Sequence, residues 1–444
     1  MQIKNICCIG AGYVGGPTMA VIALKCPHIN VTVVDSNSDK IKAWNGSLKN
    51  LPVYEPGLAE IVGQVRHRNL FFSKNIADNI EKAEMIFMAV NTPTKTEGEG
   101  AGMAADLKYI ELCTRDIAKY SKTDKIVIEK STLPVRTAEK IKEILVENST
   151  DIHFEILSNP EFLAEGTAIQ DLFKSDRVLI GGDQTPSGGK AVQALVDIYS
   201  NWIPLDRILT TNVWSSELSK LASNAMLAQR ISSINSLSAL CDKTEADIGE
   251  LSKAIGMDHR IGPHFLKASV GFGGSCFQKD ILNLTYLCHH YGLHEVAEYW
   301  HQIVKINNYQ KTRFTQTIID GLGGIVKNKK ITILGWAFKV NTNDSRESPA
   351  IDVAEKLLNA GAFLQIYDPM VKKKRIIDDI KNILEHKGSS SERIDLLLKQ
   401  VSIFKDLKSS LNQSDAFAIL TNWDEFSNYK RETIKVKTIP VFQI

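Results

Sequence analysis

The sequence predicts an α/β protein with two doubly wound, Rossmann-like domains that are joined by a long central helix and a helical linker domain. In the first half, short apolar runs alternate with stretches of helical periodicity, which is typical of a parallel sheet covered by helices. A long helical pattern then continues without Pro or Gly, and a strand, helix, strand order returns in the last part. We therefore expect domains over residues 1–211, 212–325 and 326–444.

Five apolar runs define the expected first sheet, because each one precedes a turn and a helix-like stretch. These runs are Ile6 to Ile9, Val31 to Val34, Met85 to Val90, Lys125 to Ile128 and Phe154 to Leu157.

The central helix is predicted from about Asn212, where apolar residues recur at helical spacing for nearly thirty residues. They are Leu218, Leu221, Ala225, Ala228, Ile231, Ile234, Leu237 and Leu240. Further helices should continue to about Ile319, and Gly321 to Gly324 should break them.

The last domain should begin with a strand at Lys330 to Leu334, followed by a helix over 348–360 and strands at Phe363 to Tyr367 and Ala416 to Leu420. The basic and polar stretch from Lys372 to Arg393 is expected to be a solvated helix and loop without a function of its own.

Composition narrows the class of protein. Apolar residues make up 43% of the 444 residues and charged residues 23%, as in ordinary folded proteins. The 53 Lys and Arg against 51 Asp and Glu leave a net charge of +2, too small for a nucleic-acid-binding surface. We find no apolar run of bilayer length and no leader pattern, so we expect a cytoplasmic protein without a membrane partner. The seven cysteines lack C-x-x-C spacing, which favours reduced thiols, and no metal site is predicted.

A dinucleotide fingerprint follows the first strand. Gly10-Ala11-Gly12-Tyr13-Val14-Gly15 lies between a strand and a helical pattern, so its backbone N–H groups can face a pyrophosphate. Asp35 ends the second strand, where a carboxylate can accept hydrogen bonds from a ribose and repel a 2′-phosphate. This favours NAD over NADP, although the positive charge of the nearby Lys40 would weaken the repulsion of a 2′-phosphate. The alternative is a tight turn that binds no cofactor.

Three further strand ends carry polar clusters at the edge where open α/β sheets bind ligands. The clusters are Asn91-Thr92-Pro93-Thr94, Ser131-Thr132 and Ser158-Asn159-Pro160-Glu161. Such residues also make ordinary turns, so their shared position is what favours a site. Glu161 and Glu165 would share one face if their stretch is helical, which suits acid–base or water-orienting chemistry.

Lys220 and Asn224 lie four residues apart on the predicted central helix and should project together from one turn. The apolar surroundings would favour a neutral, proton-accepting amine, whereas the alternative is a surface lysine.

The glycine-rich stretch from Gly271 to Asp280 is the most unusual in the chain. Its glycines let the backbone approach a ligand just before Cys276, a candidate nucleophile near a helix start, and Asp280 follows four residues later. The alternative is a buried structural cysteine.

Together, the fingerprint, Ser158 to Gly166, Lys220 to Asn224 and Gly271 to Asp280 resemble the UDP-glucose 6-dehydrogenase family, within the UDP-glucose/GDP-mannose dehydrogenases. The resemblance covers nearly the whole chain. Further stretches, Val90 to Thr96, Trp214 to Leu221 and Ala268 to Gly274, look like the animal-type enzymes.

The resemblance implies an NAD-dependent four-electron oxidation of UDP-glucose to UDP-glucuronate through a thiohemiacetal and a thioester on Cys276, followed by hydrolysis. The catalytic residues that it implies are Cys276, Lys220, Asp280, Glu161, Asn224 and Thr132. Lys220 would act as the base, Lys220 and Asn224 would stabilise oxyanions, and Asp280, Glu161 and Thr132 would hold or activate water.

The resemblance also implies two sets of binding residues. For NAD they are Gly10, Ala11, Gly12, Tyr13, Val14, Gly15, Asp35, Lys40, Val90, Asn91, Thr92, Pro93, Thr94, Ser131, Thr132, Glu165, Cys276 and Arg346. For UDP-glucose they are Glu161, Phe162, Leu163, Ala164, Glu165, Lys220, Asn224, Arg260, Lys267, Ala268, Ser269, Val270, Gly271, Phe272, Gly273, Phe338 and Lys339.

By the same resemblance, the last domain binds UDP, since Gly335-Trp336-Ala337-Phe338-Lys339 lacks the G-x-G pattern of an NAD site. Arg260 is placed across a subunit interface, which implies a dimer or a hexamer built as a trimer of dimers. In the family, the strand that corresponds to Ile439 to Gln443 is followed by an Asp-Gly-Arg-Arg segment that helps to hold the substrate. The sequence here stops at Ile444, so we expect weaker binding of the nucleotide sugar. Two alternatives stay open: another nucleotide sugar, such as UDP-N-acetylmannosamine or GDP-mannose, or a binding subunit without turnover.

Overall fold

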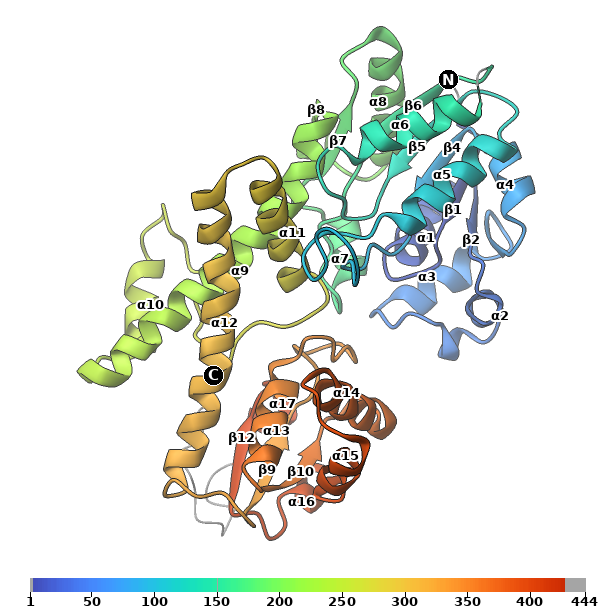
Figure 1. Cartoon of the computed structure of the whole chain (residues 1–444). Helices are drawn as coiled ribbons and strands as arrows, with labels where there is room; N and C mark the ends of the chain where they lie inside the picture. Colours follow the sequence, from blue (N-terminus) through green and yellow to red (C-terminus); the bar gives the residue numbers. More distant parts are fainter. Residues whose placement is uncertain (1–2, 150, 428–444) are drawn as a thin grey trace. The chain divides into compact units, whose positions relative to one another are not determined.

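The computed structural model describes residues 3–149 and 151–427, and the expected strand at Ile439 to Gln443 lies outside them. The chain forms two compact units (Figure 1). The first comprises Met1–Ser223 and Leu282–Tyr291, and the second comprises Asn224–Ile281 and Gly292–Ile444.

The first unit is built on an eight-stranded sheet in the order β3-β2-β1-β4-β5-β6-β7-β8. Its strands are β1 (Asn5–Ile9), β2 (Asn30–Val34), β3 (Leu70–Ser73), β4 (Met85–Met88), β5 (Lys125–Glu129), β6 (Phe154–Ser158), β7 (Val178–Gly182) and β8 (Ile208–Asn212). Neighbours from β3 to β6 are parallel, as predicted, whereas β7 and β8 run parallel to each other and antiparallel to β6. The strand order reverses between β1 and β4, the position where open α/β sheets bind ligands.

Helices cover both faces of this sheet. They are α1 (Gly15–Lys25), α2 (Ser38–Asn45), α3 (Leu58–Val65), α4 (Ile76–Lys82), α5 (Lys108–Tyr120), α6 (Thr137–Asn148), α7 (Ala168–Phe173) and α8 (Pro186–Tyr199), with short 3-10 turns η1 (Leu48–Asn50) and η2 (Leu205–Arg207). Two apolar clusters form between the helices and the sheet. The sheet residues alternate between these clusters: Cys8 belongs to one and Cys7 to the other.

The long central helix is confirmed as α9 (Val213–Thr244), and both units contain part of it. It begins where the side chain of Asn212 accepts a hydrogen bond from the backbone N–H of Ser215. The following helices are α10 (Ile248–Gly256), α11 (Phe277–His290) and α12 (His294–Gly321).

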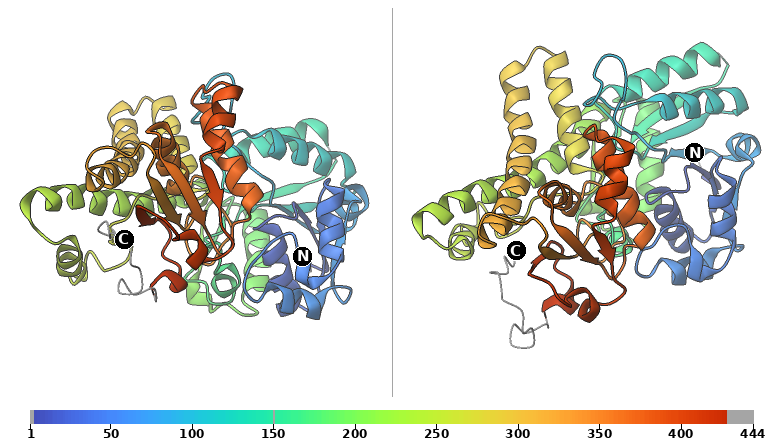
Figure 2. Two further views of the ribbon diagram at one scale, coloured as in Figure 1. Left: turned by 90° about the horizontal axis from the view of Figure 1, so that it is seen from below. Right: turned by 60° about the horizontal axis from the view of Figure 1, so that its bottom comes forward.

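The second unit contains a four-stranded parallel sheet in the order β11-β10-β9-β12. Its elements are β9 (Lys330–Leu334), α13 (Pro349–Asn359), β10 (Phe363–Tyr367), α14 (Lys373–His386), α15 (Ser391–Leu398), β11 (Val401–Ile403), α16 (Leu407–Ser410), β12 (Ala416–Ile419) and α17 (Asp424–Ser427). Figure 2 shows helices packed against this small sheet from two further directions. The strand, helix, strand repeat predicted for this region is therefore present.

The stretch from Lys372 to Arg393 differs from its prediction as a solvated segment. Although its outer face is charged, α14 buries Ile376, Asp379, Ile380 and Leu384. The apolar positions recur at helical spacing, but the many charges between them hide this pattern from a reading of composition.

Candidate functional site

The glycine turn after β1 is shaped for a ligand. Gly10 has a φ of +113°, and a side chain there would collide with the carbonyl group of Ala89. Gly12, in contrast, has open space where its Cβ would lie. The helix α1 begins at Gly15, so the positive end of its dipole lies close to this open position. A pyrophosphate could therefore approach the backbone at Gly12.

Asp35 closes the turn from the end of β2. Its carboxylate accepts hydrogen bonds from the backbone N–H groups of Ala11 (3.0 Å) and Asn37 (2.9 Å) and from Lys40 Nζ (2.8 Å). Burial by itself would raise the pKa of Asp35, but these hydrogen bonds outweigh it and lower the pKa. The side chain is thus ionised, as an acceptor for ribose hydroxyls must be, and Lys40 pairs with it.

The loops after β4 and β5 are tied to each other at the carboxyl edge of the sheet. Ser131 Oγ donates to the carbonyl oxygen of Val90 (2.6 Å), and Thr92 Oγ1 donates to that of Thr132 (3.1 Å). Two of the polar clusters predicted from the sequence therefore lie side by side in the first unit.

The third cluster carries a buried ion pair. Glu161 Oε1 lies 3.4 Å from Lys220 Nζ, and only 10% and 5% of the two side chains are exposed. The first turn of α9 is fixed to β6 because Ser216 Oγ donates to the carbonyl oxygen of Ser158 (3.1 Å). Lys220 lies one turn further along α9, next to the loop that bears Glu161.

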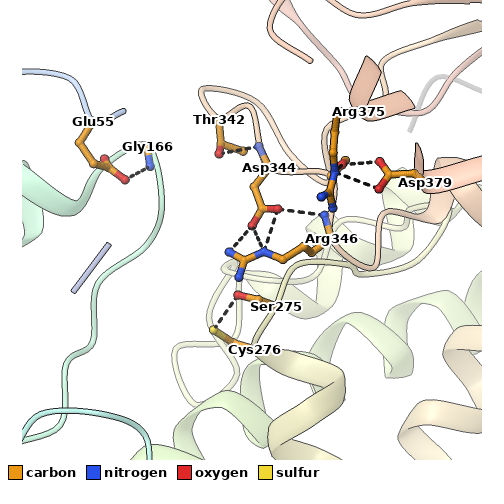
Figure 3. Close-up of polar contacts among 10 residues, drawn as sticks. Glu55, Gly166, Ser275, Cys276, Thr342, Asp344, Arg346, Arg375 and Asp379 are labelled. Carbon is orange, nitrogen blue, oxygen red and sulfur yellow. Dashed lines mark hydrogen bonds and ion pairs between the residues drawn. The ribbon is translucent and has the colours of Figure 1, made fainter. Parts of the chain in front are cut away.

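Glu161 and Glu165 do not share a helix face, because the segment between β6 and α7 is irregular. This segment, which contains Phe162 to Ala164, donates backbone hydrogen bonds to two carboxylates, one from the loop before α3 and one from α7. Glu55 accepts from the N–H of Gly166 (2.8 Å; Figure 3), and Asp171 accepts from the N–H of Ala164 (2.9 Å). The ring of Phe162 lies under Arg177, at 3.8 Å from its guanidinium carbon to the ring centroid.

In the second unit, Cys276 immediately precedes α11, and its carbonyl oxygen accepts from the N–H of Asp280 (2.8 Å). Asp280 is buried, with Asn224 Nδ2 2.6 Å and Lys279 Nζ 3.8 Å from its carboxylate oxygens. Ser275 Oγ lies 3.5 Å from Cys276 Sγ (Figure 3). Cys276 is half-buried, whereas the other six cysteines are buried and free. The structure thus brings together Cys276, Asp280 and Asn224.

Two buried amides shape the loop that leads to Cys276. Asn307 accepts from the N–H of Phe272 (2.8 Å) and donates to its carbonyl oxygen (3.0 Å), while Asn235 accepts from the N–H of Ser269 (2.7 Å). A side chain at Gly271, where φ is +126°, would meet Asn307 Oδ1 at 2.7 Å. The loop conformation therefore depends on this glycine.

Gly274 lies against the ring of Phe338 and Gly273 lies near the Cβ of the same residue. The N–H of Gly274 donates to the carbonyl oxygen of Arg346 (2.9 Å). The predicted substrate residues from Ser269 to Gly273 and Phe338 are thus neighbours within the second unit. Lys339 Nζ lies 5.7 Å from the ring centroid of Phe338.

The two arginines singled out from the sequence bind acids within their own turns. Arg346 is held by both carboxylate oxygens of Asp344: its Nε lies 3.0 Å from Oδ1 and 2.8 Å from Oδ2, and its Nη2 lies 2.6 Å from Oδ2 (Figure 3). Arg260 binds Asp258 in the same way, with 78% of its side chain exposed. The structure does not bring Arg260 to the other predicted residues of the second unit.

Three polar residues that shape these sites were not recognised in the sequence: Lys130, Asn235 and Asn307. Each is nearly fully buried. The only signal is a polar residue within or directly after an apolar pattern, which is also typical of a solvated position.

Three family models match the chain in succession. They describe the NAD binding domain (residues 4–203), the central domain (214–309) and the UDP binding domain (332–442) of the UDP-glucose/GDP-mannose dehydrogenase family. The chain belongs to this dehydrogenase family. Its glycine turn, open at Gly12 and closed by an ionised Asp35, fits the NAD that the first domain of the family binds.

Relatives of known name extend over nearly the whole chain. A rice protein named UDP-glucose 6-dehydrogenase 5 is 57% identical over 96% of this chain and 90% of its own length. The mouse UDP-glucose 6-dehydrogenase is 56% identical over 100% of this chain and 88% of its own length.

Among solved structures, the UDP-glucose dehydrogenase of the archaeon Pyrobaculum islandicum aligns with a TM-score of 0.84 and 30% identity over 97% of this chain and 92% of that one. The predicted fold, an α/β dehydrogenase with two Rossmann-like domains and a central helix, is thereby confirmed. No helix among the described residues is long and apolar enough to span a membrane.

Proposed function

We propose that this member of the family oxidises the C6 alcohol of UDP-glucose to the carboxylate of UDP-glucuronate, with Cys276 as the covalent catalyst. One observation carries the proposal: of seven cysteines, only Cys276 is more than marginally accessible, and it lies at the start of a helix beside the buried Asp280–Asn224 pair. The domains we assign to NAD binding, association and UDP-sugar binding are 1–211, 212–325 and 326–444.

The reaction needs a base, a nucleophile and water. NAD⁺, when bound, accepts a hydride in each of the two oxidations. Lys220 accepts the proton of the C6 hydroxyl group as the alcohol becomes an aldehyde. The Cys276 thiol then adds to the aldehyde carbon and forms a thiohemiacetal, and loss of its hydride and hydroxyl proton gives a thioester.

Hydrolysis completes the cycle: water adds to the thioester carbon, the C–S bond breaks, and the thiol returns with release of the carboxylate. Asp280, Glu161 and Thr132 hold or activate this water, and Lys220 and Asn224 stabilise the oxyanions. The hydrogen bond from Asn224 Nδ2 to Asp280 fixes the orientation of both side chains.

The stoichiometry of the reaction tests this proposal. We expect two NADH for each UDP-glucose consumed by the full chain, because the aldehyde stays bound until the second oxidation. One NADH per UDP-glucose would mean that the aldehyde escapes. If UDP-glucose yielded no NADH at all, the substrate assignment would be contradicted. UDP-N-acetylmannosamine and GDP-mannose, supplied separately, would then identify the alternative substrate.

Cys276→Ser should bind NAD and UDP-glucose but lose turnover by on the order of 10³-fold or more, because an ester is harder to form and cleave than a thioester. Steady-state NADH formation and isothermal titration measure the two effects. Cys241→Ser, which changes a buried cysteine of the same unit, is the matched control. Normal turnover by Cys276→Ser would exclude covalent catalysis.

We further infer that the chain self-associates along α9, as a dimer or as a hexamer of three dimers, in the cytoplasm. Leu218, Met226, Leu237 and Leu240 of this helix are 38–60% exposed, which favours a partner surface. The exposed Arg260 would then reach the substrate of a neighbouring copy. Arg260→Ala should weaken UDP-glucose binding without changing the mass measured by light scattering.

A further inference from the structure

Arg177, the residue before β7, is a half-buried arginine of the first unit that contacts two separate segments. Its guanidinium carbon lies 3.8 Å from the ring centroid of Phe162, and its Nη2 donates to Ser223 Oγ on α9 (3.2 Å). It forms no ion pair with any residue in 3–149 and 151–427. A planar guanidinium can stack on a ring while its N–H groups bind elsewhere, so one arginine can join a ring to a helix.

The ammonium group of Lys220 meets two groups of the loop after β6. Its Nζ lies 3.4 Å from Glu161 Oε1 and 5.4 Å from the ring centroid of Phe162. Only 5% of the Lys220 side chain is exposed. The position of this amine therefore depends on where the loop lies relative to α9.

The loop after β6 is irregular, so side chains from other elements must hold it in place. Its start is fixed where Ser216 Oγ donates to the carbonyl oxygen of Ser158, and its end is fixed where Glu55 accepts from the N–H of Gly166. Between these two points, the ring of Phe162 is held by the guanidinium of Arg177.

The second contact of Arg177 lies close to Lys220 along α9. Lys220 and Ser223 are three residues apart, so their side chains lie on the same side of the helix. Arg177 thus joins the loop to the helix next to the place where Glu161 meets Lys220.

We propose that Arg177 is a positioning residue for Lys220, because it holds the ring of Phe162 over the amine and fixes the loop against α9. This inference rests on the proposed function, in which Lys220 takes the hydroxyl proton. A base that is misplaced by a fraction of an ångström loses rate, whereas binding of the substrate changes less.

The first test measures the position of the ring by NMR. The full chain is labelled with ¹³C at lysine Cε, and the Lys220 signal is assigned by its loss in Lys220→Arg. Phe162→Leu should change the chemical shift of this signal, because the ring current of Phe162 is removed. Arg177→Leu should move the signal in the same direction, and in the double variant Arg177→Leu should add little.

The second test measures turnover in the same variants. Arg177→Leu should lower kcat for UDP-glucose oxidation about tenfold or more, with a smaller change in KM. Phe162→Leu should also lower kcat, and the double variant should be no slower than the slower single variant, because both changes release the same contact.

Arg207 provides the matched control. It is an exposed arginine whose Nη1 donates to the carbonyl oxygen of Ser175 (3.4 Å), two residues before Arg177. Arg207→Leu removes a guanidinium from the same region without touching Phe162, so the Lys220 signal and kcat should stay unchanged.

An unchanged Lys220 signal in Arg177→Leu would overturn the inference, and so would a moved signal with an unchanged kcat or additive losses in the double variant. If Arg177→Leu does not fold, Arg177→Gln can still donate to Ser223 and serves for the same measurements. Since the NMR signal does not depend on turnover, the expected shifts in a protein that does not oxidise UDP-glucose would contradict the proposed function and not the contact of Arg177 with Phe162.

Discussion

The two Rossmann-like sheets begin with the same device and use it differently. In each, a glycine with positive φ follows the first strand, Gly10 after β1 and Gly335 after β9. In each, an aspartate at the end of the neighbouring strand accepts hydrogen bonds from backbone N–H groups of this turn. Asp35 accepts from Ala11, and Asp368 accepts from Trp336 and Ala337.

The two turns differ in how far the aspartate and the backbone around it remain open to a ligand. Asp368 is buried and also accepts from the indole of Trp423 and from two N–H groups of its own loop, so five donors share its two oxygens. Its turn contains the fully buried Trp336. Asp35 has three such donors and keeps part of its side chain exposed, and Gly12 beside it faces open space. The same backbone arrangement thus leaves space for a ligand in one sheet, whereas in the other its hydrogen bonds are all used within the fold.

Replacing the two aspartates should separate these roles most clearly. Asp368→Ala should lower the free energy of unfolding by at least about 3 kcal/mol, because several buried donors lose their acceptor. Asp35→Ala should change stability much less and weaken NAD binding about tenfold or more. Chemical denaturation and isothermal titration measure the two effects. Equal losses of stability in both variants would contradict the comparison.

The glycines provide a second contrast of smaller size. In Gly335→Ala the new Cβ would lie 2.5 Å from Thr421 Cβ on a backbone with φ of +93°, so we expect a loss of about 2 kcal/mol in stability. Gly12→Ala should fold normally but weaken NAD binding, since its methyl group would occupy space that a pyrophosphate needs. Unchanged NAD affinity in Gly12→Ala would show that the ligand does not approach this position.

Buried acids extend the comparison. In the second unit, Asp379 accepts from Trp336 Nε1 (3.0 Å) and Ser345 Oγ (2.5 Å) and pairs with Arg375 at 2.9 Å (Figure 3). In the first unit, Glu129 at the end of β5 faces another acid, Glu217 of α9. Burial raises the pKa of Glu129, and the negative charge of Glu217 raises it further. Burial also raises the pKa of Glu217, to about 7, although hydrogen bonds from the N–H groups of Ala138 and Arg136 act in the opposite direction.

This acid pair should make stability depend on pH. Between the ordinary glutamate pKa and about 7 the folded chain binds more protons than the unfolded chain, so stability falls as pH rises through this window. Glu129→Gln should reduce that fall by about 1 kcal/mol, because it removes one of the two acids. Chemical denaturation at a series of pH values measures the free energy of unfolding of each variant. Glu139→Gln, which changes an exposed glutamate, is the control. A parallel pH profile in Glu129→Gln would refute the role of the pair.

Much of the fold and part of the candidate site could be predicted because they depend on short-range constraints. The fingerprint from Gly10 to Gly15 and Asp35 follow from strand order and turn geometry, and α9 follows from helical spacing. The position of Cys276 before a helix follows from its glycine-rich neighbourhood. These patterns concern residues within one or two elements, where backbone geometry alone decides which side chains come together.

The tertiary structure alone decided which distant polar groups meet in the interior. The pairing of Glu161 with Lys220, the place of Lys130 beside Asn159, and the support of Phe272 by Asn307 each join residues from separate elements. A buried lysine or amide has the same identity in the sequence as a solvated one. Only the packing of the elements determines whether it loses water, and therefore which charge or hydrogen bond must replace that water.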